Sequence, residues 1–280
     1  MHFDDKEVEK FINRLKKAKE ELSKQSYADI KNILNSVEFN IPVAIFPKGS
    51  NFLRCRVHNE NEIFFTQVKD LSYRTDLENI KNFGRANEPC QSIFYCSNND
   101  WISFVEISKI AREMEDKPLE YISGGLWVAT EDIYAVTLMT NDNIIGKNKE
   151  LDELSKNLQK HIIDQNDEAA RAYSKLMEFL SKEFSTEAKK DSKHYKITAA
   201  FTNCIFENIQ NADCIVYPST LDVERGLNFA FKPESVDKKL HFYSAMRRKM
   251  QNTTEKNYLE TEFIESERYL EKTEIINWQI

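Results

Sequence analysis

Apolar residues recur at helical spacing over the first forty residues of the chain. In the first stretch they are Val8, Phe11, Ile12 and Leu15, separated by lysines and glutamates. This is the pattern of an amphipathic helix. Ser26 can cap a second helix, whose apolar positions are Tyr27, Ile30 and Ile33. We therefore predict two helices within residues 4–37, and a helical extension, residues 1–40, that packs on the main domain or presents a surface to a partner.

From about residue 41 the chain changes to short apolar segments of strand length. The segments predicted to be strands are 41–46, 52–57, 63–68, 92–96, 126–129 and 133–139. Residues 81–88 are predicted to form a polar loop. A residue within 98–100 can cap a helix that continues to Ile110. Gly124 and Gly125 are interpreted as a turn before the next strand.

The middle of the chain, residues 148–210, is predicted to be mainly helical. One apolar stripe consists of Leu151, Leu154, Leu158 and Ile162, and the next of Ala169, Ala172, Tyr173, Leu176, Phe179 and Leu180. Strands return at 213–218, at 227–231 and in parts of 236–270. Because helices and strands do not alternate regularly, we predict an α+β domain over residues 41–280. Strands from 50–140 and 213–280 should meet in one mixed sheet, with the helices of the middle packed outside it.

Composition and charge exclude several classes of protein. Hydrophobic residues make up 41% and charged residues 30% of the chain, as in an ordinary globular protein. The net charge of −7 argues against a general nucleic-acid binder, which needs a basic surface. No apolar run is long enough to cross a bilayer, and the polar N-terminus lacks the apolar region of a signal peptide. We therefore expect a cytoplasmic protein without a membrane partner.

The common metal and catalytic motifs are missing from the sequence. The five cysteines are odd in number and irregularly spaced, which does not fit a disulfide framework. Cys90 and Cys96 are too far apart for a zinc knuckle, as are Cys204 and Cys214, so we expect free thiols and no metal. No phosphate-binding glycine loop, dinucleotide-binding glycine motif, nucleophile elbow or His-Glu-x-x-His sequence is present.

Four short segments nevertheless carry residues suited to chemistry. They are Phe52-Leu53-Arg54-Cys55-Arg56; Phe83-Gly84-Arg85-Ala86-Asn87; Ser92-Ile93-Phe94-Tyr95-Cys96-Ser97, followed by Glu106; and Val216-Tyr217-Pro218-Ser219-Thr220, followed by Gly226-Leu227-Asn228-Phe229-Ala230-Phe231. Arg54 and Arg56 alternate along a predicted strand and should share one face of it. Glu106 lies in an apolar stretch, where a partly buried carboxylate needs a partner or a function.

In this order and spacing, the four segments resemble the RES-domain family. The ending Ile275-Ile276-Asn277-Trp278 is also similar to the family's closing strand, and the match covers about residues 50–280. The resemblance implies a fold related to ADP-ribosyltransferases. It implies NAD as a substrate rather than a cofactor, and loss of nicotinamide as the chemistry. The chain departs from the family at Phe94-Tyr95-Cys96-Ser97, where Leu-Tyr-Leu-Ala is commoner.

The resemblance assigns roles that the residue types can fulfil. Glu106, Tyr95 and Ser219 would be catalytic; Arg54, Arg56, Arg85 and Asn228 would bind NAD, without metal. The planar fork of arginine suits the two phosphates of NAD, and an aromatic face suits the nicotinamide cation. A carboxylate near the ribose favours the positive charge that develops when the bond breaks.

Simpler interpretations remain open for each of these residues. The arginines could be surface, salt-bridge or loop-fixing residues, Tyr95 part of the core, Ser219 a turn residue and Asn228 a satisfied strand amide. At the level of function, we expect an NAD glycohydrolase or phosphorylase acting as a toxin or defence effector. The alternatives are a protein ADP-ribosyltransferase and an inactive binding module with the RES fold. The resemblance allows an antitoxin or other inhibitor protein, and a homo-oligomer, as partners.

Overall fold

The computed structural model describes residues 5–36, 43–58, 64–108, 110, 119–138, 153–154, 167–186, 192–219, 226–252 and 258–279. The strands in these residues are β1 (Val43–Phe46), β2 (Asn51–Val57), β3 (Phe94–Ser97), β4 (Leu119–Ala129), β5 (Ile133–Thr137), β6 (Cys214–Pro218), β7 (Leu227–Phe231), β8 (Leu240–Asn252) and β9 (Tyr258–Glu265). The α-helices are α1 (Asp5–Glu20), α2 (Tyr27–Asn35), α3 (Asp100–Val105), α5 (Asp167–Ser185), α6 (Lys196–Asn208) and α7 (Pro233–Lys239).

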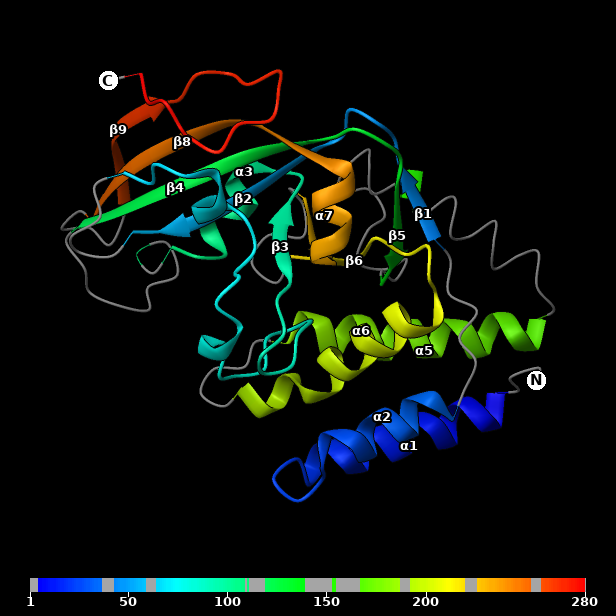
Figure 1. Cartoon of the computed structure of the whole chain (residues 1–280). Helices are drawn as coiled ribbons and strands as arrows, with labels where there is room; N and C mark the ends of the chain where they lie inside the picture. The colour runs from blue at the N-terminus through cyan, green and yellow to red at the C-terminus, as the bar shows by residue number, and fades with distance from the viewer. Residues whose placement is uncertain are drawn as a thin grey trace.

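The described strands form one mixed sheet in the order β1-β5-β6-β7-β3-β2-β4-β8-β9 (Figure 1). Only β5 and β6 pair in parallel; the other neighbours are antiparallel. The predicted α+β class is confirmed, and strands from both ends of the chain meet in one sheet as expected. This arrangement brings segments more than a hundred residues apart side by side.

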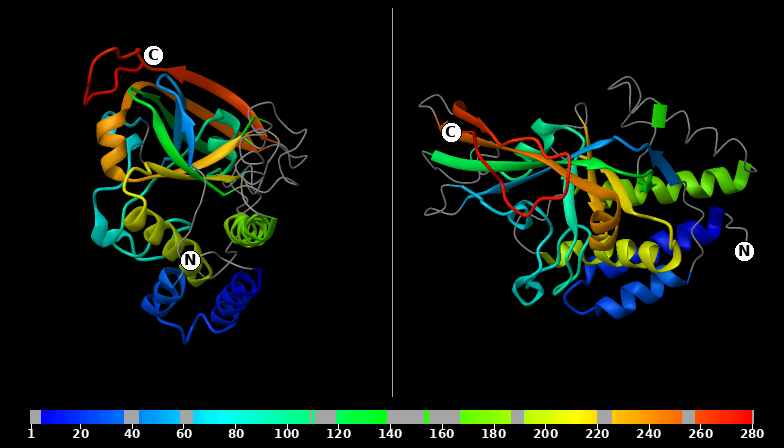
Figure 2. Two further views of the ribbon diagram at one scale, coloured as in Figure 1. Left: turned by 90° about the vertical axis from the view of Figure 1, so that its right-hand side faces the viewer. Right: turned by 45° about the horizontal axis from the view of Figure 1, so that its top comes forward.

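The N-terminal helices belong to the same core as the sheet. Helix α1 packs against α5 and α2 against α6, and Figure 2 shows both on the side of α5 and α6 away from the sheet. Their buried side chains Leu15, Ile30 and Leu34 belong to one apolar cluster with the strand residues. The predicted cap is confirmed, because the Ser26 hydroxyl accepts from the backbone N–H of Asp29 at 3.1 Å. Packing of this extension on the domain is therefore confirmed.

The second predicted stripe of the helical middle is confirmed at four positions of α5, because Ala172, Leu176, Phe179 and Leu180 are buried. The side chains of its other two residues, Ala169 and Tyr173, lie outside the described part of the structure. In the first stripe, Leu154 packs against the core. The other residues of that stripe, Leu151, Leu158 and Ile162, lie outside the described residues. Within the part of the chain that the structure describes, no helix is long and apolar enough to cross a membrane.

The interpretation of Gly124 and Gly125 as a turn is wrong, because both lie inside β4. A Cβ atom on Gly125 would come within 3.1 Å of Leu71 Cβ and of Phe242 Cε2. Because glycine has no side chain, the side chains of Leu71 and Phe242 can pack directly against the strand backbone at this position. A glycine in a strand and a glycine in a turn look alike in sequence, and only the tertiary neighbours separate them.

Three other predicted elements are shorter or absent. Residues 64–68 form no strand: Gln67 makes a single bridge with Ile275, and a 3-10 turn, Val68–Leu71, follows. The helix expected to reach Ile110 ends at Val105, with Glu106 as its C-cap. The expected closing strand near the C-terminus is limited to isolated bridges at Ile275 and Trp278.

Shortening a buried side chain of α1 should unfold the whole domain more easily, since α1 shares its core. Leu15→Ala should lower the free energy of unfolding by about 2–5 kcal/mol, measured by denaturant titration. The neighbouring exposed position provides the control, because Lys16→Ala should change stability by less than about 0.5 kcal/mol. Equal stability of the two variants would mean that α1 is not part of the cooperative core.

Candidate functional site

A cavity of about 440 Å³ lies where two neighbouring strands diverge. Strands β2 and β3 pair at a single position, Leu53 opposite Ser97, and Figure 1 shows β3 at a steep angle to β2. The volume is within the range of small-molecule pockets. Six of the seven predicted site residues line the cavity: Arg54, Arg56, Arg85, Tyr95, Glu106 and Asn228. The seventh, Ser219, is buried and bonded to Glu106.

Arg54 spans the gap between the diverging strands. Its Nε donates to the carbonyl of Ser72 at 2.9 Å, and its Nη1 donates to the carbonyl of Tyr95 at 3.2 Å. The second bond satisfies a β3 carbonyl beside the split in the ladder. Burial lowers the pKa of Arg54 to about 10. The side chain therefore stays cationic at neutral pH, held by neutral groups.

Arg56 and Arg85 are anchored in the same manner, by carbonyls and aromatic rings. Arg56 Nη1 donates to the carbonyl of Asp70 at 3.1 Å, and its guanidinium lies 4.9 Å from the ring centre of Phe65. Arg85 donates to the carbonyls of Phe184 and Thr186. These carbonyls end α5, where a positive charge is favoured by the helix dipole. The loop-fixing interpretation of Arg85 and a position in the cavity are therefore compatible.

Three guanidinium groups gather in this cavity. In the described residues, no ion pair joins Arg54, Arg56 or Arg85 to an aspartate or glutamate. Each guanidinium has five N–H donors, and the carbonyls use one or two in each case. The cavity is therefore suited to an anionic ligand with several oxygen acceptors.

Glu106 supplies negative charge to the same cavity. It stands at the C-terminus of α3, where the helix dipole disfavours a carboxylate. Two donors compensate, because Ser219 Oγ and Asn228 Nδ2 each donate to Glu106 Oε1 at 2.9 Å. Ser219 directly follows β6 and Asn228 lies in β7. Two adjacent strands thereby fix the carboxylate position.

Tyr95 holds the loop that carries Arg85. Its hydroxyl donates to Asn87 Oδ1 at 2.8 Å and accepts from the backbone N–H of Ala86 at 2.8 Å. A Cβ atom on Gly84 would lie 2.9 Å from this hydroxyl, so the loop needs glycine there. Burial raises the pKa of Tyr95, which keeps the hydroxyl protonated. These contacts give its hydroxyl a positioning function.

The cavity also contains residues that the sequence prediction missed. Tyr217 lies in a segment already noted, but Tyr195 lies just before α6, where no local pattern marks it. Their ring centres lie 5.8 and 5.2 Å from the guanidinium carbon of Arg85. Both rings therefore position or shield that cation.

Two thiols reach the cavity but are poor nucleophiles. Burial raises the pKa of Cys55 to about 12 and also raises that of Cys96. A thiol in this state is protonated at neutral pH, whereas the thiolate is the reactive form. In the part of the chain that the structure describes, no group of three or more histidine, cysteine or acidic side chains could hold a metal ion.

Comparisons of the sequence with protein-family models and with curated proteins found no match.

Proposed function

We propose that this chain binds NAD in the cavity beside β2 and β3 and breaks the nicotinamide–ribose bond. The observation that carries the proposal is the pairing of opposite charges across one small cavity. Arg54, Arg56 and Arg85 provide cationic donors without carboxylate partners in the described residues, while Glu106 is held by Ser219 and Asn228.

Each part of NAD would meet a suitable group. The pyrophosphate would bind the arginines, whose forks can donate two parallel hydrogen bonds to phosphate oxygens. The ribose of the nicotinamide half would lie at Glu106. Tyr95 and Tyr195 offer aromatic surface to the cationic nicotinamide ring.

In the proposed reaction the bond between ribose C1′ and the nicotinamide nitrogen breaks, and its electron pair stays on nitrogen. Nicotinamide then leaves as a neutral molecule, so no protein acid is required. The Glu106 carboxylate stabilises the positive charge that develops on the ribose. Attack by water or by an ionised phosphate oxygen forms the new C1′–O bond. When water attacks, it loses a proton to solvent.

We also propose that the sheet is an ADP-ribosyltransferase-like core of the RES type over residues 41–280. The support is the resemblance in sequence together with a mixed sheet that splits at the cavity. The enzyme would act in the cytoplasm as a toxin or defence effector, restrained by an inhibitor protein.

Product analysis distinguishes the acceptors. The protein is incubated with NAD labelled in its adenylate half, with and without phosphate, and with bystander protein. Free ADP-ribose indicates hydrolysis, ADP-ribose-1″-phosphate indicates phosphorolysis, and labelled protein indicates transfer. Intact NAD in every condition would reject the proposed chemistry and favour the inactive binding module.

Removing one of the donors that hold Glu106 in the described residues should slow the reaction without abolishing it. Ser219→Ala should lower kcat by about tenfold, the equivalent of one hydrogen bond to a charged group. Ser235→Ala is the control, because Ser235 Oγ donates to the buried carboxylate of Asp213 at 2.8 Å outside the cavity. If both variants retain wild-type turnover per folded molecule, Ser219 does not support Glu106 in catalysis.

A further inference from the structure

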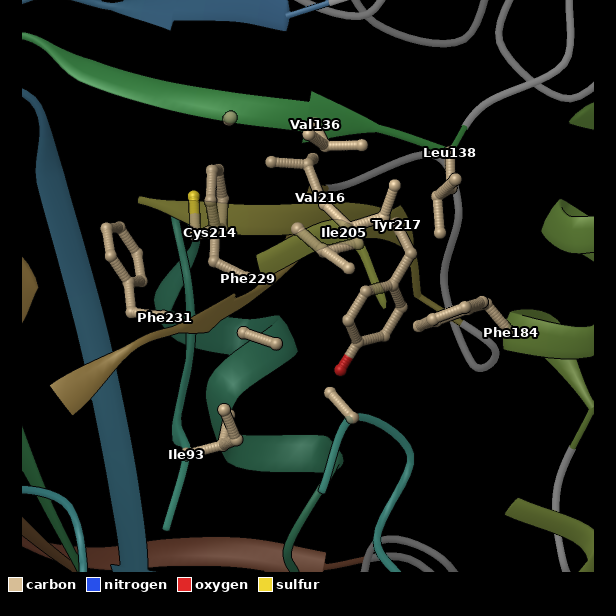
Figure 3. Close-up of a cluster of buried hydrophobic side chains, with 14 of the residues drawn as sticks. Ile93, Val136, Leu138, Phe184, Ile205, Cys214, Val216, Tyr217, Phe229 and Phe231 are labelled. Atoms are coloured by element: carbon tan, nitrogen blue, oxygen red, sulfur yellow. The ribbon is translucent and has the colours of Figure 1, made fainter. Parts of the chain in front are cut away.

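Tyr217 occupies an unusual position for a core tyrosine. It lies in β6 and is only 4% exposed. Its ring packs beside Phe184, with the ring centres 5.3 Å apart. Figure 3 shows its hydroxyl oxygen at the end of the ring that points away from Val216 and Leu138. The residue also lines the cavity of the candidate site.

The Tyr217 hydroxyl makes no hydrogen bond to another residue in the described part of the chain, unlike that of Tyr95, which makes two. In the described residues, the side-chain nitrogen and oxygen atoms that are both inaccessible to solvent and without a hydrogen-bond partner belong to Ser92, Trp127, Ser181, Arg247 and Glu262. Tyr217 is not among them, so its hydroxyl is open to the cavity.

An unpaired hydroxyl in this setting needs an explanation. A hydroxyl that faces an open cavity can bond to water or to a ligand there. Phenylalanine would fill the same apolar space but would offer no polar group to the cavity. A ligand in the cavity that pairs with the oxygen accounts for tyrosine at this position.

The strand register directs Tyr217 towards the reacting end of the cavity. Tyr217 lies opposite Asn228 in the β6–β7 ladder, and directly opposed residues project from the same face of a sheet. Asn228 in turn donates to Glu106. On its other side, the ring of Tyr217 faces the guanidinium of Arg85. Tyr217 therefore neighbours both Arg85 and the asparagine that holds Glu106.

We propose that the Tyr217 hydroxyl is a nucleotide-binding group, which donates a hydrogen bond to a phosphate or ribose oxygen between Arg85 and Glu106. This inference rests on the proposed function and identifies which part of NAD the group contacts: the ribose phosphate of the nicotinamide half. Burial raises the pKa of Tyr217, so the hydroxyl remains a neutral donor over the physiological range. The contact is present before and during bond breaking, so it contributes to binding rather than to rate.

Tyr217→Phe removes one oxygen and keeps the packed ring. Calorimetric titration with ADP-ribose, which has no nicotinamide bond to break, should show binding about tenfold weaker than wild type. The KM for NAD should rise by a similar factor, with kcat within about twofold of wild type. The melting temperature should be unchanged or higher, because no protein hydrogen bond is lost.

Two controls separate binding from structure. Tyr95→Phe loses two protein hydrogen bonds and should melt at a lower temperature. Tyr269→Phe, which loses an acceptor for the backbone N–H of Asn277 away from the cavity, should leave ADP-ribose binding unchanged. The inference would be overturned if Tyr217→Phe bound ADP-ribose with wild-type affinity, or if it melted at a temperature as low as that of Tyr95→Phe. The proposed function would still stand in that case, provided that the wild-type protein consumes NAD. A wild-type protein that neither binds ADP-ribose nor consumes NAD would overturn both.

Discussion

Glu106→Gln is expected to lower kcat for nicotinamide release by about 100-fold or more. Glutamine can still accept hydrogen bonds from Ser219 and Asn228, so the shape of the site is retained. It cannot supply the negative charge that favours the developing ribose cation. Because that charge appears mainly in the transition state, KM for NAD should change far less than kcat.

The control for this variant is the same chemical change outside the cavity. Glu207→Gln removes the ion pair with Lys31 at 2.5 Å and should leave turnover per folded molecule at the wild-type value. Circular dichroism and melting curves establish that both variants are folded. A folded Glu106→Gln protein with wild-type kcat would remove Glu106 from the mechanism and direct attention to another carboxylate.

Arg54→Lys should show the opposite kinetic pattern, with KM for NAD raised about 10- to 100-fold and kcat reduced much less. Lysine retains the charge but offers one ammonium group in place of a planar fork. The single ammonium group of lysine cannot bond to the carbonyls of Ser72 and Tyr95 and bind a phosphate at the same time. Initial rates over a range of NAD concentrations measure both constants.

An arginine outside the cavity controls for the loss of the fork itself. Arg74 forms an exposed two-bond pair with Asp76, and Arg74→Lys should alter neither KM nor kcat. If Arg54→Lys instead lowers kcat alone, Arg54 contacts the reacting centre and does not hold the phosphates.

Local sequence patterns predicted the short central strands well. The segments at 52–57 and 227–231 became β2 and β7. β7 is buried along its whole length, which fits its mainly apolar sequence. The pattern failed where tertiary contacts decide. Gly125 is a crossing point for Leu71 and Phe242, and residues 64–68 gain a single bridge instead of a ladder.

The candidate site depended on a different kind of information. Its residues come from β2, the loop around Arg85, β3, the end of α3 and β7, and no periodicity predicts that these elements converge. The resemblance in motif order suggested the set. The sequence did not indicate Tyr195, because its place in the cavity arises from the packing of residues 192–208 and not from any neighbouring motif. The length of α3 was also misjudged, so that Glu106 is a helix C-cap and not a mid-helix residue.

The most direct test of the proposed reaction is a time course of nicotinamide release from NAD, followed by chromatography with substrate in large excess over protein. Each wild-type protein molecule should release many nicotinamide molecules, and the rate should be about 100-fold lower for Glu106→Gln in the same assay. Intact NAD after prolonged incubation with folded, wild-type protein would contradict the proposed reaction.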